Sequence, residues 1–276
     1  MVNPGVQKSV VVTGGASGIG LAMTRHFASE GHKVAVLDIN DRTGREIIAR
    51  VAEENPHATL CFKRSDVSCW EDQAAAFEEI YREHGRIDVV MANAGISEQG
   101  QSSIVKVEED VPVKPDTKSI DVNFLGAVYS VKLALHYMHK NKGGGSPSRG
   151  SIVVTASNAG LYPFPVAPLY AAAKAGLVNL VRSLAPVVIR SNIQINAIAP
   201  AVLETNIAPS TDLFKNMIVT PMSTLTGGVA RLLADPSLNG QVFEIHGDSA
   251  TPRPPPDYVD EDSRKNIETF WRLGYA

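Results

Sequence analysis

Short apolar runs alternate with segments of helical spacing along most of the 276-residue chain, and this alternation is what most limits its fold. Runs such as SVVVT at 9–13 and KVAVL at 33–37 are rich in β-branched residues and apolar on both faces, as in strands covered by helices on both sides. A strand, a helix and a second strand in succession form a right-handed unit with parallel strands. The sequence therefore predicts an α/β fold.

The expected elements can be placed by residue range. The apolar runs predict strands at 9–13, 33–37, 59–62, 87–92, 151–155, 194–199 and 241–245. The segments with helical spacing predict helices at 19–29, 42–53, 70–84, 122–139, 170–182 and 224–233. We therefore expect a single domain in which a doubly wound parallel sheet of about seven strands carries helices on both faces.

The C-terminal part of the chain breaks this alternation. The stretch 251–257, TPRPPPD, packs four prolines into five positions and can be neither a helix nor a central strand. The tail at 261–276 has the spacing of a short helix, expected to dock on the body or on a neighbouring subunit. We therefore divide the chain into a domain at 1–250 and a proline-rich C-terminal extension at 251–276.

Composition and charge exclude other classes of protein. The chain carries 26 Lys and Arg against 29 Asp and Glu, a net charge of −3, and we expect no nucleic-acid partner. No uninterrupted apolar run reaches the ~20 residues of a membrane span, and we expect no signal peptide.

The two cysteines, Cys61 and Cys69, are expected as reduced thiols of a cytoplasmic protein. His136 and His139 lack a third ligand nearby in sequence, so no metal site is expected.

A glycine-rich loop follows the first expected strand and opens the first expected helix. The sequence TGGASGIG at 13–20 supplies residues that tolerate positive φ and leave room for a phosphate against the backbone. The helix N-terminus behind it offers free N–H groups and the positive end of a dipole. The loop residues expected to contact a dinucleotide are Gly14, Ser17, Gly18, Ile19 and Gly20.

Asp38 ends the second expected strand, 18 residues after Gly20. A carboxylate there accepts hydrogen bonds from the adenosine ribose and repels a 2′-phosphate. Neither Ile39 nor the glycine loop supplies a cation for that phosphate, so the pattern favours NAD over NADP. A turn or helix-capping aspartate is the structural alternative. A methyltransferase that uses S-adenosylmethionine shares the glycine loop and the acidic residue, so other residues must decide the chemistry.

Three further residues fit the oxidation of an alcohol. Tyr170 and Lys174 are spaced i, i+4 on one helix face, and Ser157 lies 13 residues upstream of Tyr170, after a strand. The reaction needs a base for the hydroxyl proton while hydride leaves. Bringing a tyrosine from a pKa near 10 to about 7 takes roughly 4 kcal/mol. A lysine ammonium and a positive nicotinamide ring can supply that, with the serine hydrogen-bonded to the reacting oxygen. A methyltransferase has no use for this set.

Together these motifs resemble the classical, NAD-dependent type of short-chain dehydrogenase/reductase, over about residues 6–247. The resemblance implies a Rossmann-type fold with NAD as cofactor and a homodimer or homotetramer built through the helices at 122–139 and 170–182. Details such as SNAGLYP after the fifth strand look most like the hydroxyprostaglandin dehydrogenase-like branch. Ala201 departs from the family's Pro-Gly motif.

The resemblance also implies roles for single residues. It names four catalytic residues, Asn123, Ser157, Tyr170 and Lys174, in which Asn123 holds the water of a proton relay from Lys174. Beyond the glycine loop it implies cofactor contacts at Asp38, Ile39, Asp66, Val67, Asn93, Ala94, Gly95, Tyr170, Lys174, Pro200, Val202 and Thr205.

The substrate is expected to be an uncharged, apolar secondary alcohol or ketone. The apolar stretch 203–222 suits a lid, and the expected pocket walls are Tyr162, Phe164, Pro165 and Phe214. Two other functions stay open: an NADPH-dependent ketoreductase that tailors secondary metabolites, and a nucleotide-binding regulator without turnover.

Overall fold

The computed structural model describes residues 7–98, 102–107, 110–141, 148–205, 207 and 211–274. In this part of the chain one sheet of eight strands has the order β3-β2-β1-β4-β5-β6-β7-β8. The strands are β1 (Ser9–Thr13), β2 (Lys33–Asp38), β3 (Thr59–Arg64), β4 (Val89–Ala92), β5 (Gly150–Thr155), β6 (Ile193–Pro200), β7 (Val242–His246) and β8 (Ser249–Pro252). Neighbouring strands run parallel except for β7 and β8.

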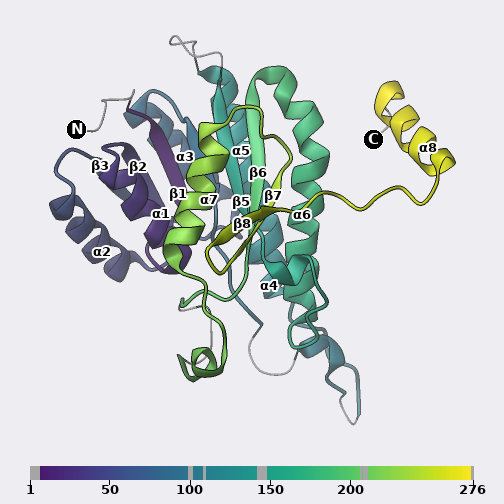
Figure 1. Cartoon of the computed structure of the whole chain (residues 1–276). Coiled ribbons are helices and arrows are strands. Elements are labelled where there is room, and N and C mark those ends of the chain that lie inside the picture. Colours follow the sequence, from purple (N-terminus) through teal and green to yellow (C-terminus); the bar gives the residue numbers. More distant parts are fainter. Residues whose placement is uncertain are drawn as a thin grey trace.

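Helices cover both faces of the sheet (Figure 1). The α-helices are α1 (Gly18–Ser29), α2 (Asp41–Glu54), α3 (Trp70–His84), α4 (Lys118–Ile120), α5 (Gly126–Lys140), α6 (Pro168–Val188), α7 (Met222–Ala234) and α8 (Glu261–Leu273). Helices α3, α5 and α6 share one core cluster, and α1, α2 and α7 share the other. The predicted doubly wound α/β fold is therefore confirmed.

The valines of β1 explain why this strand lies in the middle of the sheet. Val11 faces the core shared with α3, α5 and α6, whereas Val10 and Val12 face the opposite core, and all three are fully buried. A run that is apolar at every position suits a strand covered on both sides. The chain adds β2 and β3 on one side of β1, and then β4 and the later strands on its other side. The strand order therefore switches between β1 and β4, and folds of this kind bind ligands in the crevice at the carboxyl ends of these two strands.

The sheet has one strand more than expected. Strand β8 pairs antiparallel with β7 at the edge of the sheet, where Pro252 lies opposite Phe243. A proline is tolerated there because an edge strand needs only part of its hydrogen bonds. The strand crosses the expected boundary at residue 250. Beyond it, an extended segment leads to α8, which lies apart from the body and buries none of its residues (Figure 1).

Two helices differ most from their predicted bounds. The expected helix at 122–139 is a run from 118 to 140 that contains one π-helical turn, Asp121–Leu125, between α4 and α5. Helix α6 begins at Pro168, because a proline suits the first turn of a helix. The segment Pro168–Ser191 is long and apolar enough to cross a membrane by length and composition, with a mean hydropathy of 1.4. Its Leu177 and Val181 lie in the core against the sheet, which accounts for its apolar composition.

Candidate active site

The glycine loop forms a cradle between β1 and α1, and half of its residues are glycines without a side chain. Gly14 and Gly18 have φ values of +63° and +49°, which favour glycine. A Cβ on Gly20 would lie 2.0 Å from the Gly14 carbonyl oxygen, and one on Gly14 would lie 2.8 Å from the Ala94 Cα. Ser17 precedes α1 without a side-chain cap, and the first turn of α1 holds no acidic residue. The free N–H groups and dipole of this turn therefore fit an anionic pyrophosphate.

Asp38 lies at the carboxyl end of β2 and is buried beside the glycine loop. Its Oδ2 accepts a hydrogen bond from the Ala16 N–H at 3.1 Å, and its Oδ1 accepts one from the Asn40 N–H at 3.1 Å. The carboxylate thus stabilises the loop and the turn after β2. Oδ1 also accepts the Asn40 side-chain amide at 3.4 Å, whereas Oδ2 can accept a further bond, so the group also fits a ribose hydroxyl.

The Asn93-Ala94-Gly95 segment closes the cradle at the end of β4. The Asn93 amide group donates to the Thr13 carbonyl at 3.1 Å and accepts from the Thr155 hydroxyl at 3.1 Å. The Asn93 side chain therefore ties together the ends of β1, β4 and β5. Ala94 packs directly on Gly14, which explains why both residues are small.

The remaining expected cofactor contacts lie after the carboxyl ends of β2, β3 and β6. Ile39 is exposed, and a hydrogen bond from the Ser68 hydroxyl holds the pKa of Asp66 below its usual value. Val67 is buried against Gly126 at the start of α5.

Beyond Pro200 at the end of β6, the Val202 carbonyl accepts a hydrogen bond from the Thr220 N–H, and Thr205 lies against Gly18. Of the expected lid at 203–222, residues 206 and 208–210 lie outside the described residues.

Ser157, Tyr170 and Lys174 meet at the same edge of the sheet. Ser157 follows β5, where its Oγ accepts the Ala159 N–H at 3.1 Å, and its hydroxyl is hydrogen-bonded to Tyr170. Lys174 lies one helical turn beyond Tyr170 on α6, with Nζ 5.5 Å from the centre of the Tyr170 ring. The Lys174 ammonium donates to the Thr155 carbonyl at 2.8 Å, which fixes its position. The spacing in the sequence therefore brings a hydroxyl, a phenol and an ammonium together.

Burial controls the protonation of this group. It raises the pKa of Tyr170, and the hydrogen bond with Ser157 opposes that rise. Burial also lowers the pKa of Lys174 to about 8. In the chain by itself, burial therefore outweighs the other influences on the pKa of the phenol. A further positive charge bound beside the ring would favour the phenolate.

Asn123 lies in the π turn and is almost fully buried. Its Nδ2 donates to the carbonyls of Ile96 and Ser119 at 2.8 and 2.7 Å, and its Oδ1 accepts the Ile96 N–H at 3.1 Å. The amide therefore clamps the segment after β4 to the π turn, and only Oδ1 retains a free lone pair. The clamp also explains Gly95, because a Cβ there would lie 2.5 Å from Oδ1.

Glu98 is a residue of this site that the sequence analysis missed. Its Oε2 accepts hydrogen bonds from the N–H groups of Leu169 and Tyr170 at 3.0 and 3.2 Å, in the first turn of α6. The signal in the sequence is indirect. Helix α6 is preceded by Ala167, which has no side-chain acceptor, so its first N–H groups need a partner from elsewhere.

The expected pocket walls have different surroundings. The ring of Phe164 lies 6.4 Å from the ring of Tyr170. Tyr162 instead donates its hydroxyl to Glu244 at 3.0 Å and accepts from Arg253 at 2.8 Å, so it links the site loop to β7 and the C-terminal segment. Pro165 is exposed, and Phe214 is half-buried in a short turn at Thr211–Asn216.

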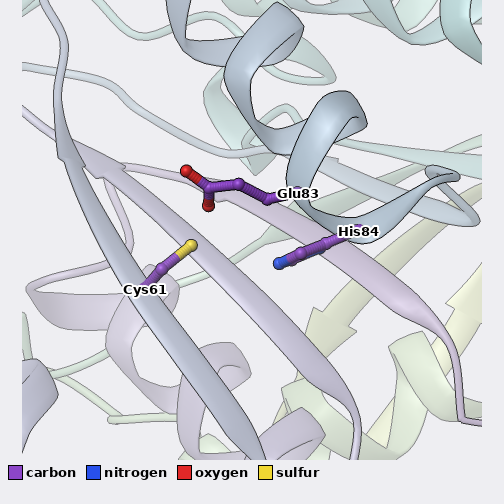
Figure 2. A group of neighbouring side chains, drawn as sticks. All are labelled: Cys61, Glu83 and His84. Atoms are coloured by element: carbon purple, nitrogen blue, oxygen red, sulfur yellow. The ribbon is translucent and has the colours of Figure 1, made fainter.

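Cys61, Glu83 and His84 point toward one another at the amino edge of the sheet, with ligand atoms within 4.8 Å of one another (Figure 2). Lys63 donates to Glu83 at 2.7 Å, and a ring nitrogen of His84 lies 2.8 Å from the Ser9 hydroxyl. Burial raises the pKa of the Cys61 thiol to about 11. Because the thiol stays protonated and the other two groups have protein partners, we assign the cluster no catalytic role.

Comparison with known proteins identifies relatives of the chain. The family model described as short chain dehydrogenase matches residues 8–215. The chain is 40% identical over 203 residues to the short-chain dehydrogenase/reductase prx4 of Penicillium roqueforti, covering 73% of this chain and 56% of that protein. It therefore spans just over half the length of this relative.

Two further relatives match over more of their length. The chain is 29% identical over 260 residues to the rat (Rattus norvegicus) 15-hydroxyprostaglandin dehydrogenase whose name specifies NAD(+), covering 86% of this chain and 90% of that one. The crystal structure of levodione reductase superposes with a TM-score of 0.74 at 29% identity, covering 87% of this chain and 96% of that one.

Proposed function

The chain belongs to the short-chain dehydrogenase/reductase family, and on that premise we propose that it is an NAD-dependent oxidoreductase that interconverts a secondary alcohol and a ketone. One observation carries the proposal: Ser157, Tyr170 and Lys174 converge beside the glycine cradle. A hydroxyl, a phenol and an ammonium at that position suit proton transfer next to a dinucleotide.

The three residues have different tasks in the proposed reaction. In the oxidising direction, the phenolate oxygen of Tyr170 takes the hydroxyl proton, while the adjacent C–H bond breaks and its electron pair leaves with the hydrogen as hydride. A nicotinamide cofactor, when bound, accepts that hydride, or supplies it in the reverse direction. The Ser157 hydroxyl donates a hydrogen bond to the reacting oxygen and keeps it close to Tyr170. The Lys174 ammonium favours the phenolate and reaches the ribose.

Asn123 is assigned a supporting part. Its side chain holds Ile96 and the π turn in place, and the free lone pair of Oδ1 is where a relay water from Lys174 would bind. Water held there would carry the proton of Tyr170 away from the site after each turnover.

The cofactor is assigned to NAD because of the acidic residue after β2. The Asp38 carboxylate is buried at the loop, where a 2′-phosphate would meet its negative charge. The name of the rat relative, which specifies NAD(+), supports the same choice. The other assigned contacts are the loop residues Gly14, Ser17, Gly18, Ile19 and Gly20 and the residues Ile39, Asp66, Val67, Asn93, Ala94, Gly95, Pro200, Val202 and Thr205.

The substrate is proposed to be an uncharged, apolar small molecule. The segments that follow β4 and β6 expose several large apolar side chains, namely Ile104, Val105, Val107, Val111, Val113, Ile207, Met217 and Ile218.

We further propose a cytoplasmic homodimer or homotetramer that pairs through α5 and α6, with the catalytic domain at 1–250 and an extension at 251–276 whose α8 docks on a neighbouring subunit.

A substrate screen tests this function. Wild-type protein is mixed with hydroxy and keto lipids, steroids and polyketide-like compounds, with each of the two nicotinamide cofactors, and the absorbance of the reduced nicotinamide is followed. We expect turnover of at least one class, with NAD(H) preferred. Tighter binding of NADPH than of NADH would favour the tailoring ketoreductase, and binding of a cofactor without hydride transfer across the whole panel would favour the regulator.

A further inference from the structure

The catalytic helix α6 lacks a cap of its own. The residue before it is Ala167, which offers no side-chain acceptor, and Pro168 at its first position has no N–H group. Leu169 and Tyr170 therefore carry the first N–H groups of a 21-residue helix that need an acceptor. A helix start of this kind is held in place only if another part of the chain supplies one.

Glu98 supplies that acceptor from 72 residues before Tyr170. Its Oε2 lies 3.0 Å from the Leu169 nitrogen and 3.2 Å from the Tyr170 nitrogen. Its Oε1 accepts the Ser102 hydroxyl at 2.5 Å, so the carboxylate is itself held in place. The negative charge also lies at the positive end of the α6 dipole, where it is stabilising.

The segment that carries Glu98 is fixed to the other parts of the site. Ile96, two residues earlier, is clamped on both its N–H and its carbonyl by Asn123 of the π turn. Ser97 donates its hydroxyl to the Ile207 carbonyl in the loop after β6 at 3.1 Å. The loop after β4, the π turn, the loop after β6 and the start of α6 are therefore joined within three consecutive residues, 96–98.

From this geometry we infer that Glu98 is a positioning residue, which holds the first turn of α6 and thereby sets the place of Tyr170 between Ser157 and Lys174. The inference rests on the proposed function, in which Tyr170 is the acid and base. Glu98 bonds to the backbone of Tyr170 and does not contact the reacting atoms. Its loss should therefore slow proton transfer and leave the cofactor cradle intact, because the cradle is built from β1, α1 and β4.

The test compares Glu98→Ala with Glu98→Gln. The glutamine keeps an oxygen of the same reach that can accept both N–H groups, whereas the alanine removes it. We expect kcat of Glu98→Ala to fall about tenfold to 100-fold, since a misplacement of about 1 Å has that effect on a reacting group. We expect Glu98→Gln to retain kcat within about threefold of wild type, and both variants to keep the wild-type dissociation constant for NAD.

Two more variants keep the test decisive. Glu46→Ala on the exposed face of α2 is the matched control and should leave kcat unchanged. Ser102→Ala leaves both bonds to α6 in place and should lower kcat less than Glu98→Ala does. If Glu98→Ala does not fold, Glu98→Asp takes its place, because its shorter side chain cannot reach both N–H groups and should show the same loss of kcat. A kcat of Glu98→Ala within twofold of wild type would overturn the inference, as would an equal loss in Glu98→Gln.

Amide hydrogen exchange gives a readout that does not depend on turnover. The N–H groups of Leu169 and Tyr170 should exchange faster in Glu98→Ala than in wild type and Glu98→Gln. If the wild-type protein turns over no compound of the screen, the proposed function fails, while the exchange rates still decide whether Glu98 holds this turn. Unchanged exchange in Glu98→Ala would overturn the inference even in an active enzyme.

Discussion

Replacement of Lys174 by methionine removes a charge from beside Tyr170 and keeps a side chain of similar length. With 5.5 Å as the separation between the ammonium and the ring, and an effective dielectric constant of about 20, the attraction for a phenolate is about 3 kcal/mol. Its loss raises the pKa of Tyr170, because an opposite charge favours the ionised form. At pH 7 the phenolate population should fall about 100-fold, and the rate of alcohol oxidation should fall with it.

The pH dependence of this loss follows from Lys174 itself. Burial lowers its pKa to about 8, so the wild-type protein carries the ammonium below that pH and loses it above. The ratio of wild-type to Lys174→Met rates should therefore be largest near pH 7 and shrink as the pH rises through 8. The assay is kcat for alcohol oxidation from pH 6 to 10, with the exposed Lys132→Met as the control.

Loss of folding cannot account for this expected result. The shift of the Lys174 pKa from 10.5 to about 8 means that burying the charged form opposes folding by about 3 kcal/mol at neutral pH. This penalty is present below pH 8 and disappears as the pH rises toward 10.5, so Lys174→Met should be at least as stable as wild type at pH 7. A deficit in kcat that stays constant from pH 6 to 10 would refute the electrostatic reasoning.

Two further substitutions test the cofactor site. Asp38→Ser should weaken NAD binding by about tenfold, as expected for the loss of hydrogen bonds worth about 1.4 kcal/mol. It should also narrow the preference for NAD over NADP, measured as the ratio of the two dissociation constants. An unchanged ratio of these constants would contradict the assignment of Asp38 to the ribose. Gly20→Ala should abolish NAD binding and lower the melting temperature, because its Cβ would lie 2.0 Å from the Gly14 carbonyl oxygen. A wild-type dissociation constant and a wild-type melting temperature in calorimetry would show that the cradle is not as tight as described.

The features that the sequence predicted are those with a local signal. The valines of β1 face alternate cores, and a strand buried on both faces leaves an uninterrupted apolar run in the sequence. The glycines before α1 are required by positive φ and close contacts within a few residues. The pairing of Tyr170 with Lys174 was predicted from their i, i+4 spacing, which places them on one face of α6.

The features that the sequence did not predict depend on contacts between distant segments. The π turn at Asp121–Leu125 adds no break in the apolar pattern, and its Asn123 makes hydrogen bonds to Ile96, 27 residues away. Glu98 has no distinguishing signal in the sequence, because its role depends on α6, which starts without a cap of its own. Strand β8 has only four residues and ends in proline, so it resembles a turn until its pairing with β7 is known.

The proposed role of Tyr170 is tested most directly by removing a single oxygen atom. In Tyr170→Phe, the ring still fills its place beside Phe164 and Lys174, and the glycine cradle is untouched. The measurement is kcat on the substrate found by the screen, together with the dissociation constant for NAD from fluorescence quenching. We predict turnover below detection with NAD binding close to that of wild type. Turnover at the wild-type rate would contradict the assignment of Tyr170 as the acid and base.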